Sequence, residues 1–313
     1  MAVSIAAGRL AGSRTIELAA GALDATIVPS VGMVVASLRH HGTEVLGQRG
    51  GLVAYRDHGS SFGIPLLYPW ANRLSGLGYA AANIDVELDP RTTPLRLDEN
   101  GLPIHGLLSA SPRWQTIDTG CSEQAAEVSA TLDLAAHPEL LRGFPFPHRI
   151  TVTYRLDATS LRTSLTITPT GDVTVPIAFG FHPYLAPGGD RTTWRINLPV
   201  LTRATLDHRG LPTGSLETIQ PGWRPLGTDA YDNLYRSLQS PQVFEVEAPD
   251  RTITVHFDEG YPCAQVFAPT ASDFICFEPM TAPINALVTG DRLRSVAPNS
   301  RFTATFTISV RDH

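Results

Sequence analysis

Ile150-Thr-Val-Thr-Tyr-Arg-Leu156 and Leu161-Arg-Thr-Ser-Leu-Thr-Ile-Thr168 alternate apolar and polar residues. Because successive side chains of a β-strand point to opposite faces, this alternation predicts strands with one buried and one polar face. The pattern recurs in short segments, which the 26 glycines and 25 prolines of the chain separate. These segments are residues 15–19, 25–28, 34–38, 84–88, 128–134, 243–247, 252–257, 264–267, 274–277 and 302–310. Only residues 138–142 and 283–288 have the pattern of short helical turns.

Many short strands without intervening helices predict an all-β fold, in which packed antiparallel sheets carry the functional site on their loops. We therefore expect a large antiparallel β-sandwich with few short helices. No clean linker divides the chain, so we expect residues 1–313 to form one domain. The proline- and glycine-rich residues 187–190 and 211–227 are interpreted as long loops within it.

The composition narrows the functional classes. Of the 313 residues, 42% are hydrophobic and 17% are charged, as in a globular protein. The net charge of −6 disfavours nucleic acid and anionic membrane as partners. No segment approaches the roughly 20 apolar residues of a membrane span. The apolar run at residues 2–7 lacks a preceding basic residue, which makes it a poor signal peptide and favours the cytoplasm.

The numbers of cysteine and lysine residues argue against several further classes of protein. Cys121, Cys263 and Cys276 are an odd number and far apart, which supports neither a disulfide framework nor a cysteine zinc site. The sequence contains no lysine. Schiff-base enzymes, pyridoxal phosphate enzymes and P-loop lysines are therefore excluded, and arginine must make any cationic contact. We expect neither a metal nor a cofactor.

Two polar positions follow apolar runs in the first half of the chain. Arg73 follows Asn72 at the end of an aromatic and proline-rich run, where a guanidinium can bind two neighbouring hydroxyls. His105 precedes Gly106, which permits close approach of a ligand to the backbone. The structural alternatives are a surface arginine at a turn and a histidine that only supports a turn.

Two more such positions lie in the second half. His182 stands in Phe179-Gly-Phe-His-Pro-Tyr184, an apolar strand-like run that proline ends. Glu278 ends an apolar strand before Pro279, and glutamate is rarely buried there without a partner. The alternatives are a core histidine with its hydrogen bonds satisfied and an exposed glutamate at a strand end. All four residues close a strand or open a loop, so they can converge at one mouth of a sandwich.

In this order, the motifs Asn72-Arg73, Ile104-His105-Gly106, Phe181-His182-Pro183-Tyr184 and Phe277-Glu278-Pro279 resemble those of the aldose 1-epimerase (mutarotase) family. Pro283-Ile-Asn285-Ala286 and the proline-led strand that begins at Phe144 are also similar to the family pattern. The resemblance implies a galactose mutarotase-like β-supersandwich. It also implies the interconversion of the α and β anomers of a free aldose without a cofactor. We expect a monomer or a homodimer.

The resemblance assigns roles to particular residues. Glu278 would take the proton of the anomeric hydroxyl, and His182 would protonate the ring oxygen. Arg73 and His105 would hold sugar hydroxyls, together with an aspartate that is best matched by Asp232, with Asp229 as the competitor. Aromatic side chains such as Trp70, Phe146 and Tyr184 could stack on a pyranose, although core packing is expected for at least one.

His105-Gly106 continues into two leucines where the family often has a second glycine, which opens the question of which sugar is bound. A hexose-6-phosphate 1-epimerase is the alternative, with Arg56, Arg96 or Arg142 at the phosphate. A glycoside hydrolase could use Asp232 and Glu278 as its carboxylate pair, but would leave His182 without a role. A sugar-binding domain without activity is the remaining possibility.

Overall fold

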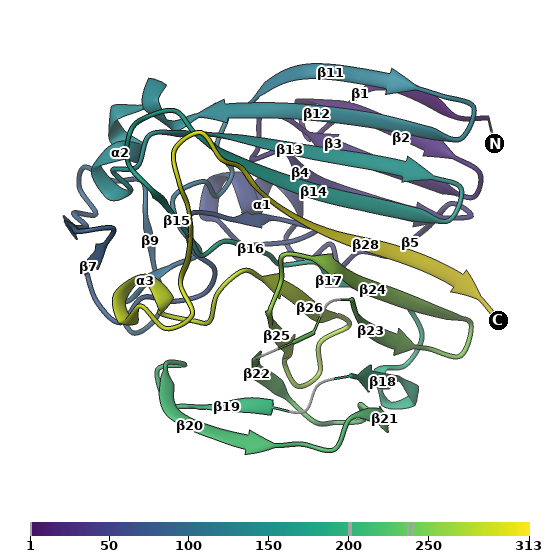
Figure 1. The fold of residues 1–313 in the computed structure, drawn as a ribbon. Helices are drawn as coiled ribbons and strands as arrows, with labels where there is room; N and C mark the ends of the chain where they lie inside the picture. The colour runs from purple at the N-terminus through teal and green to yellow at the C-terminus, as the bar shows by residue number, and fades with distance from the viewer. Residues whose placement is uncertain (1, 200–201, 237, 240) are drawn as a thin grey trace.

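The described residues form three antiparallel sheets and three short two-stranded ladders. Figure 1 shows how these strands are arranged. The computed structural model describes residues 2–199, 202–236, 238–239 and 241–313. The five-stranded sheet contains β1 (Ser4–Leu10), β2 (Ser13–Ala20), β3 (Leu23–Val28), β4 (Val34–His40) and β5 (Thr43–Glu44), in that order. The nine-stranded sheet contains, in spatial order, β11 (Gln115–Cys121), β12 (Ala125–Asp133), β13 (His148–Asp157), β14 (Ser160–Pro169), β28 (Phe302–Asp312), β24 (Arg251–Glu259), β23 (Gln242–Glu247), β18 (Arg195–Leu198) and β21 (Gly222–Pro225).

The eight-stranded sheet carries much of the candidate site. Its order is β20 (Pro212–Thr218), β19 (Thr202–Leu206), β22 (Tyr231–Arg236), β25 (Cys263–Ala268), β26 (Ile275–Met280), β16 (Gly180–Phe181) and β6 (Leu66–Leu67), and β17 (Tyr184–Leu185) also pairs with β26. The two-stranded ladders are β7 (Gly78–Ala81) with β8 (Ile84–Glu87), β9 (Arg96–Leu97) with β10 (Pro103–Ile104), and β15 (Val175–Ile177) with β27 (Arg294–Val296).

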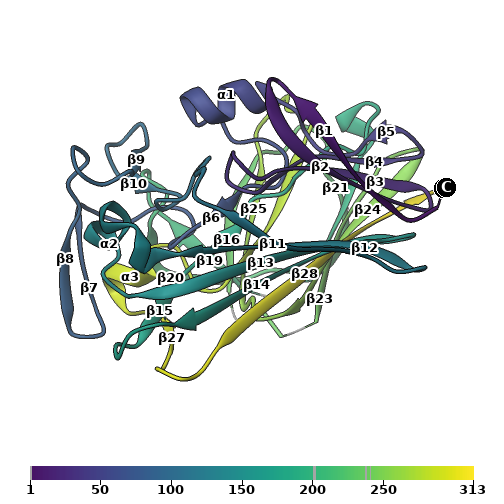
Figure 2. The ribbon, with the colours of Figure 1, turned by 90° about the horizontal axis from the view of Figure 1, so that it is seen from above.

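The sheets are arranged in layers around one large apolar cluster. The five-stranded sheet covers the β11–β14 part of the nine-stranded sheet, where β2 contacts β12 and β13 (Figure 2). The other part of the nine-stranded sheet faces the eight-stranded sheet. There the Phe244 ring lies 5.5 Å from that of Phe277, and the Phe306 ring lies 5.1 Å from that of Phe181. The predicted all-β sandwich is confirmed.

The alternation at residues 150–156 has the expected effect. Ile150, Val152, Tyr154 and Leu156 are at most 1% exposed, whereas the residues between them are more accessible. Hydroxyl side chains line the outer face, and Thr153 Oγ1 lies 2.7 Å from Ser129 Oγ on the neighbouring strand. The sequence pattern therefore sets which face of the nine-stranded sheet enters the core.

The helices are short, and one of them has no clear signal in the sequence. They are α1 (Gly51–His58), α2 (Pro138–Gly143) and α3 (Ala286–Thr289), with 3₁₀ turns at Leu134–Ala136 and Arg191–Thr193. The predicted turn at 138–142 is α2, the one at 283–288 starts only at Ala286, and α1 was not predicted. Within the described residues, no helix combines the length and hydrophobicity needed to cross a membrane.

The loop predicted at residues 211–227 is wrong, because β20 and β21 occupy most of it. β20 pairs with β19 at an edge of the eight-stranded sheet, and β21 pairs with β18 at an edge of the nine-stranded sheet. A strand at the edge of a sheet can be exposed along much of its length, so its sequence need not alternate apolar and polar residues, and proline is tolerated there. Residues 187–190 form the loop that was expected.

A buried histidine beside the core predicts how stability depends on pH. His148 is hydrogen-bonded to the Tyr68 hydroxyl and to the Phe146 carbonyl, and burial lowers its pKa to about 4. An unfolded histidine titrates near ~6.5, so between these values only the unfolded chain binds the proton. Stability is therefore lost as the pH falls through this window, by an amount on the order of 3 kcal/mol for this residue.

We expect His148→Gln to flatten the pH dependence, measured as the urea midpoint at pH 7 and at pH 4.5. The wild type should lose more stability between the two pH values than the variant does. An identical loss in both proteins would contradict this account of His148.

Candidate active site

A cavity of about 380 Å³ is lined by side chains from the eight-stranded sheet and from loops of the first half of the chain. It brings together all five residues that were predicted to be catalytic or substrate-binding. They are Arg73, His105, His182, Asp232 and Glu278. Asp229, the competitor of Asp232, is not among the lining residues.

Strand register places His182 beside Glu278. Gly180 pairs with Met280, and Tyr184 pairs with Cys276. His182, midway between Gly180 and Tyr184, therefore lies opposite Glu278, midway between Cys276 and Met280. Nε2 of His182 is 3.3 Å from Oε1 of Glu278, and both side chains are almost completely buried. Pro183 has no N–H to offer the ladder, which separates β16 from β17 at this point.

A second carboxylate lies on the next strands of the same sheet. Asp232 on β22 pairs with Phe267 on β25, and Gln265 on β25 pairs with Glu278 on β26. Gln265 Nε2 donates a hydrogen bond to Asp232 Oδ1 over 2.5 Å. Gln265 therefore holds Asp232 from the strand position paired with Glu278, a role that the sequence reasoning did not identify.

The Arg73 and His105 loops are fixed to each other by their backbones. The His105 N–H donates to the Asn72 carbonyl over 2.9 Å, and a bridge joins Arg73 to Ile104. The Arg73 guanidinium is held by Asp98, with Nε 2.6 Å from Oδ2. These contacts place the guanidinium and the imidazole on one wall of the cavity.

Gly106 has a different role from the one expected. Its φ is +73°, and a Cβ atom there would lie 2.1 Å from the Tyr68 carbonyl oxygen. The glycine therefore permits two backbone segments to approach each other, rather than a ligand to approach the backbone.

Asn285 also supports the Arg73 loop, through two hydrogen bonds. Its N–H donates to the Arg73 carbonyl over 3.1 Å, and its Oδ1 accepts from the Ser75 N–H over 2.8 Å. The Pro283-Ile-Asn285-Ala286 motif thus acts on the position of Arg73 without lining the cavity.

Two of the three aromatic side chains that were considered for sugar stacking pack in the core, as was expected for at least one of them. Trp70 is 1% exposed and packs in the core, as does Phe146, because burying a large ring is favourable. Tyr184 lines the cavity, but its ring stacks on His182 with centroids 4.4 Å apart and planes at 3°. The aromatic side chain that the sequence reasoning missed is Phe267, which is half-buried, lines the cavity and lies edge-on to His182.

Burial moves the pKa values of the central pair in opposite directions. Desolvation raises the pKa of Glu278 well above its usual value, and the nearby Asp232 charge adds to this. Desolvation lowers the pKa of His182, and the electrostatic effects of the neighbouring His105 and Arg49 act in the same direction. Burial and the charge of Arg96 lower the pKa of His105 to about 3. The base role of Glu278 and the acid role of His182 require ionised Glu278 and protonated His182, but burial favours the neutral pair in the free protein.

Three buried polar atoms of the site have no hydrogen-bond partner within the described part of the chain: Glu278 Oε2, His182 Nδ1 and His105 Nδ1. Buried polar groups in native proteins are normally hydrogen-bonded. A ligand rich in hydroxyl groups could supply such partners.

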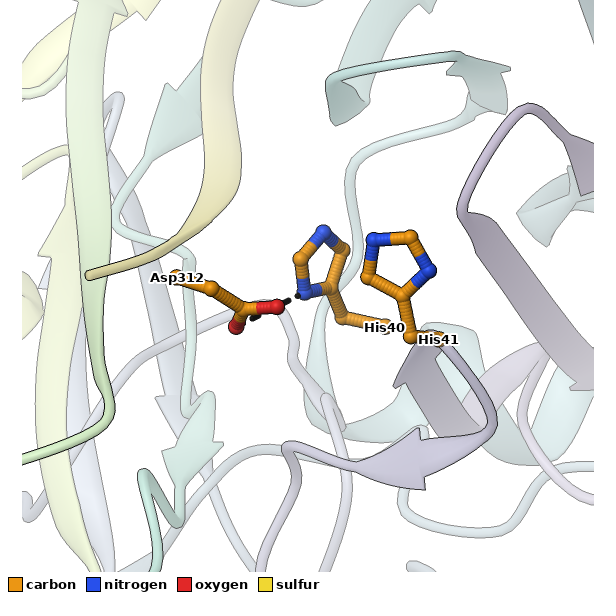
Figure 3. Close-up of side chains that lie close together, drawn as sticks. All are labelled: His40, His41 and Asp312. Atoms are coloured by element: carbon orange, nitrogen blue, oxygen red, sulfur yellow. Dashed lines mark hydrogen bonds and ion pairs between the residues drawn. The ribbon is translucent and has the colours of Figure 1, made fainter.

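A group of potential metal ligands lies outside the cavity. His40, His41 and Asp312 have ligand atoms within 4.8 Å of one another, where the end of β4 meets the C-terminal strand β28 (Figure 3). His40 Nδ1 is 3.2 Å from Asp312 Oδ1, and Arg251 Nε is 3.9 Å from the same oxygen. The aspartate already faces a cation, so this cluster is best described as a surface ion-pair network.

The comparisons with known proteins agree with the fold and the motifs. A sequence model of the aldose 1-epimerase family matches residues 14–309. The uncharacterized protein YihR of Escherichia coli K12 is 25% identical over 287 residues, which cover 88% of this chain and 87% of YihR.

Solved structures share the architecture. A galactose mutarotase-like protein from Clostridium acetobutylicum superposes with a TM-score of 0.84 at 18% identity, over 100% of this chain and 99% of that one. Galactose 1-epimerase from Lactobacillus acidophilus NCFM gives a TM-score of 0.77 at 14% identity, over 99% and 98%. The fold is therefore galactose mutarotase-like. Since the family match spans nearly the whole chain, the protein belongs to the aldose 1-epimerase family.

Proposed function

We propose that the protein interconverts the α and β anomers of an aldose by general acid–base catalysis. The observation that carries this proposal is the contact of 3.3 Å between His182 Nε2 and Glu278 Oε1 inside a polar cavity. The anomeric hydroxyl and the ring oxygen of an aldose are attached to the same carbon atom. A neighbouring acid and base can therefore serve both oxygens.

The reaction needs only proton transfer and one C–O bond. Glu278 takes the proton of the anomeric hydroxyl as the C1–O bond to the ring breaks, and His182 delivers a proton to the ring oxygen. The open-chain aldehyde turns about its C1–C2 bond, and the reverse transfers close the ring on the other face. Protons and electrons balance without an oxidant, and the two groups return to their starting states.

The other residues hold the sugar. Arg73 donates to sugar hydroxyls, His105 can donate to or accept from them, and Asp232 accepts from them. Phe267 offers a half-buried aromatic ring to an apolar face of the pyranose. The His182 contact with Glu278 favours this reaction over glycoside hydrolysis, which would leave the imidazole without a function.

A bell-shaped pH profile of kcat/KM is expected. Transfer of one proton from Glu278 to His182 converts the neutral pair into the ion pair that the mechanism uses, without a change in the number of bound protons, so the pair titrates as a unit. Because burial lowers the pKa of His182 and raises that of Glu278, a second proton binds only at low pH and the single proton is lost only at high pH. Rates measured from pH 4 to pH 10 should fall at both ends; a flat profile with chemistry rate-limiting would contradict this.

Polarimetry tests the proposed activity. A freshly dissolved α-anomer should reach its equilibrium rotation faster in proportion to the protein added, across a panel of neutral and acidic aldoses. Release of reducing sugar from an aryl glycoside, without faster anomer exchange of any free aldose, would instead identify a hydrolase.

A further inference from the structure

Three arginines line the cavity, and they differ in whether their charge is neutralised. Arg73 is paired with Asp98, and its NH2 is 3.7 Å from Glu99 Oε1. Arg49 and Arg96 line the same cavity, yet within the described residues neither has a carboxylate oxygen within 4.0 Å. Among the described residues their positive charges are therefore not neutralised by a direct ion pair, in contrast to that of Arg73.

The two unpaired guanidinium groups border the same short segment of backbone. Arg49 NH1 donates to the Ser61 carbonyl over 3.0 Å, and Arg96 NH1 donates to the Gly59 carbonyl. Residues two apart in sequence have Cα atoms at most about 7 Å from each other. We call Arg49, Arg96 and residues 59–61 the cationic corner of the cavity; all five residues are among its lining.

Both side chains are held in place while leaving donors free. Arg49 NH1 also donates to the Tyr184 hydroxyl over 3.1 Å, and its Cζ lies 5.2 Å from the Tyr184 ring centroid. The Arg96 guanidinium packs against Gly59, where a Cβ atom would lie 2.4 Å from Arg96 Cζ. Within the described residues, neither arginine uses its Nε or NH2 in a hydrogen bond, and a guanidinium fork of this kind binds oxyanions well.

The cationic corner lies next to the acid–base pair. The Tyr184 hydroxyl, which accepts from Arg49, is 3.4 Å from His182 Nε2. Glu278 and Asp232 supply negative charge on the β22–β25–β26 side. Asp98 and Glu99 also line the cavity but face Arg73, so Arg49 and Arg96 border the same cavity as the acid–base pair without an ion-pair partner among the described residues.

A neutral sugar would leave the two cations of the corner unpaired, whereas an oxyanion on the sugar would pair with both. We propose that the preferred substrate is an aldose that carries an oxyanion away from its anomeric carbon, bound by Arg49 and Arg96. Carboxylate, sulfonate and phosphate share the required chemistry. The inference rests on the proposed anomer exchange and adds the class of sugar.

The test compares matched sugars of the gluco and galacto series that differ only at C6: the neutral hexose, the uronate, the 6-sulfonate and the 6-phosphate. Anomer exchange by NMR gives kcat/KM for each, and calorimetry gives binding of each without reference to catalysis. The uronate is planar with one charge, the sulfonate tetrahedral with one charge, and the phosphate tetrahedral with up to two. The arms therefore separate the shape of the oxyanion from its charge.

At least one acidic sugar should exceed its neutral parent in kcat/KM by tenfold or more. Arg49→Gln and Arg96→Gln should each reduce that acidic-to-neutral ratio by about 10- to 100-fold, as expected for loss of a charge-assisted hydrogen bond. Arg56→Gln is the matched control. Arg56 lies on α1, does not line the cavity and pairs with Asp57, so its loss should leave the ratio unchanged.

The outcomes separate the two proposals. Neutral sugars exchanged as fast as every acidic counterpart would overturn the inference and leave the proposed function intact. Acidic sugars that bind through Arg49 and Arg96, without faster exchange of any sugar, would support the cationic corner and overturn the epimerase activity. Neither binding nor exchange of any sugar in the panel would overturn both.

Discussion

Replacing Glu278 with glutamine should lower kcat/KM for anomer exchange by about a hundredfold to ten-thousandfold, the contribution usual for a positioned general base. The amide keeps the shape of the side chain but cannot take a proton from the anomeric hydroxyl. Rates would be measured by NMR on the best substrate of the panel. Glu127→Gln, on the solvent side of β12, is the control with the same chemical change outside the cavity.

Stability distinguishes a lost base from a damaged fold. Burial raises the pKa of Glu278, so the stability associated with its protonated form is fully present below the unfolded value of about 4.3 and is lost as pH rises through the folded value. Glutamine has no such dependence. Above pH 5 the variant should therefore unfold at the same or a higher temperature than the wild type. A variant that is folded and fully active would exclude Glu278 as the base.

Replacing His182 with asparagine should cause a loss of similar size, because the ring oxygen would have no proton donor. His256→Asn is the control, since His256 lies on β24 and does not line the cavity. Groups that act as one unit show strongly non-additive effects. The double variant with Glu278→Gln should therefore be little slower than the slower single variant.

Losses in the single variants that multiply in the double variant would indicate that the two residues act independently. A purely structural His182 would change the thermal stability without removing a limb of the pH profile.

The strands were predictable because alternation is a local property. Residues 150–156 encode a buried face and a polar face without reference to any other part of the chain. The edge strands β20 and β21 carry little of this signal, and α1 begins at the second of two consecutive glycines and has few buried residues. Their structure depends on pairing and packing partners that no short window contains.

The candidate site was predictable one residue at a time but not as an arrangement. His182 and Glu278 each stand out as a polar residue in an apolar strand, yet their contact depends on the pairing of Gly180 with Met280. Gln265 carried the same kind of signal, a buried polar residue within the strand at 264–267, and could have been found from it. Arg49 stands before two glycines in a loop, and nothing in its neighbourhood indicates that it lines a cavity.

Trp70 shows the opposite error. Its aromatic ring and its position just before Asn72-Arg73 suggested a sugar-stacking surface. A large ring in an apolar segment is equally suited to the core, and only the packed structure decides between the two.

The most direct test of the central claim is the rate of exchange between the α and β anomers of an equilibrated aldose, measured by NMR exchange spectroscopy with increasing protein. The wild type should accelerate exchange of at least one sugar of the panel in proportion to its concentration, and Glu278→Gln should return that rate close to the uncatalysed value. Exchange at the uncatalysed rate for every neutral and acidic sugar, in the presence of folded wild-type protein, would contradict the assignment of His182 and Glu278 as the acid and base of an anomerase.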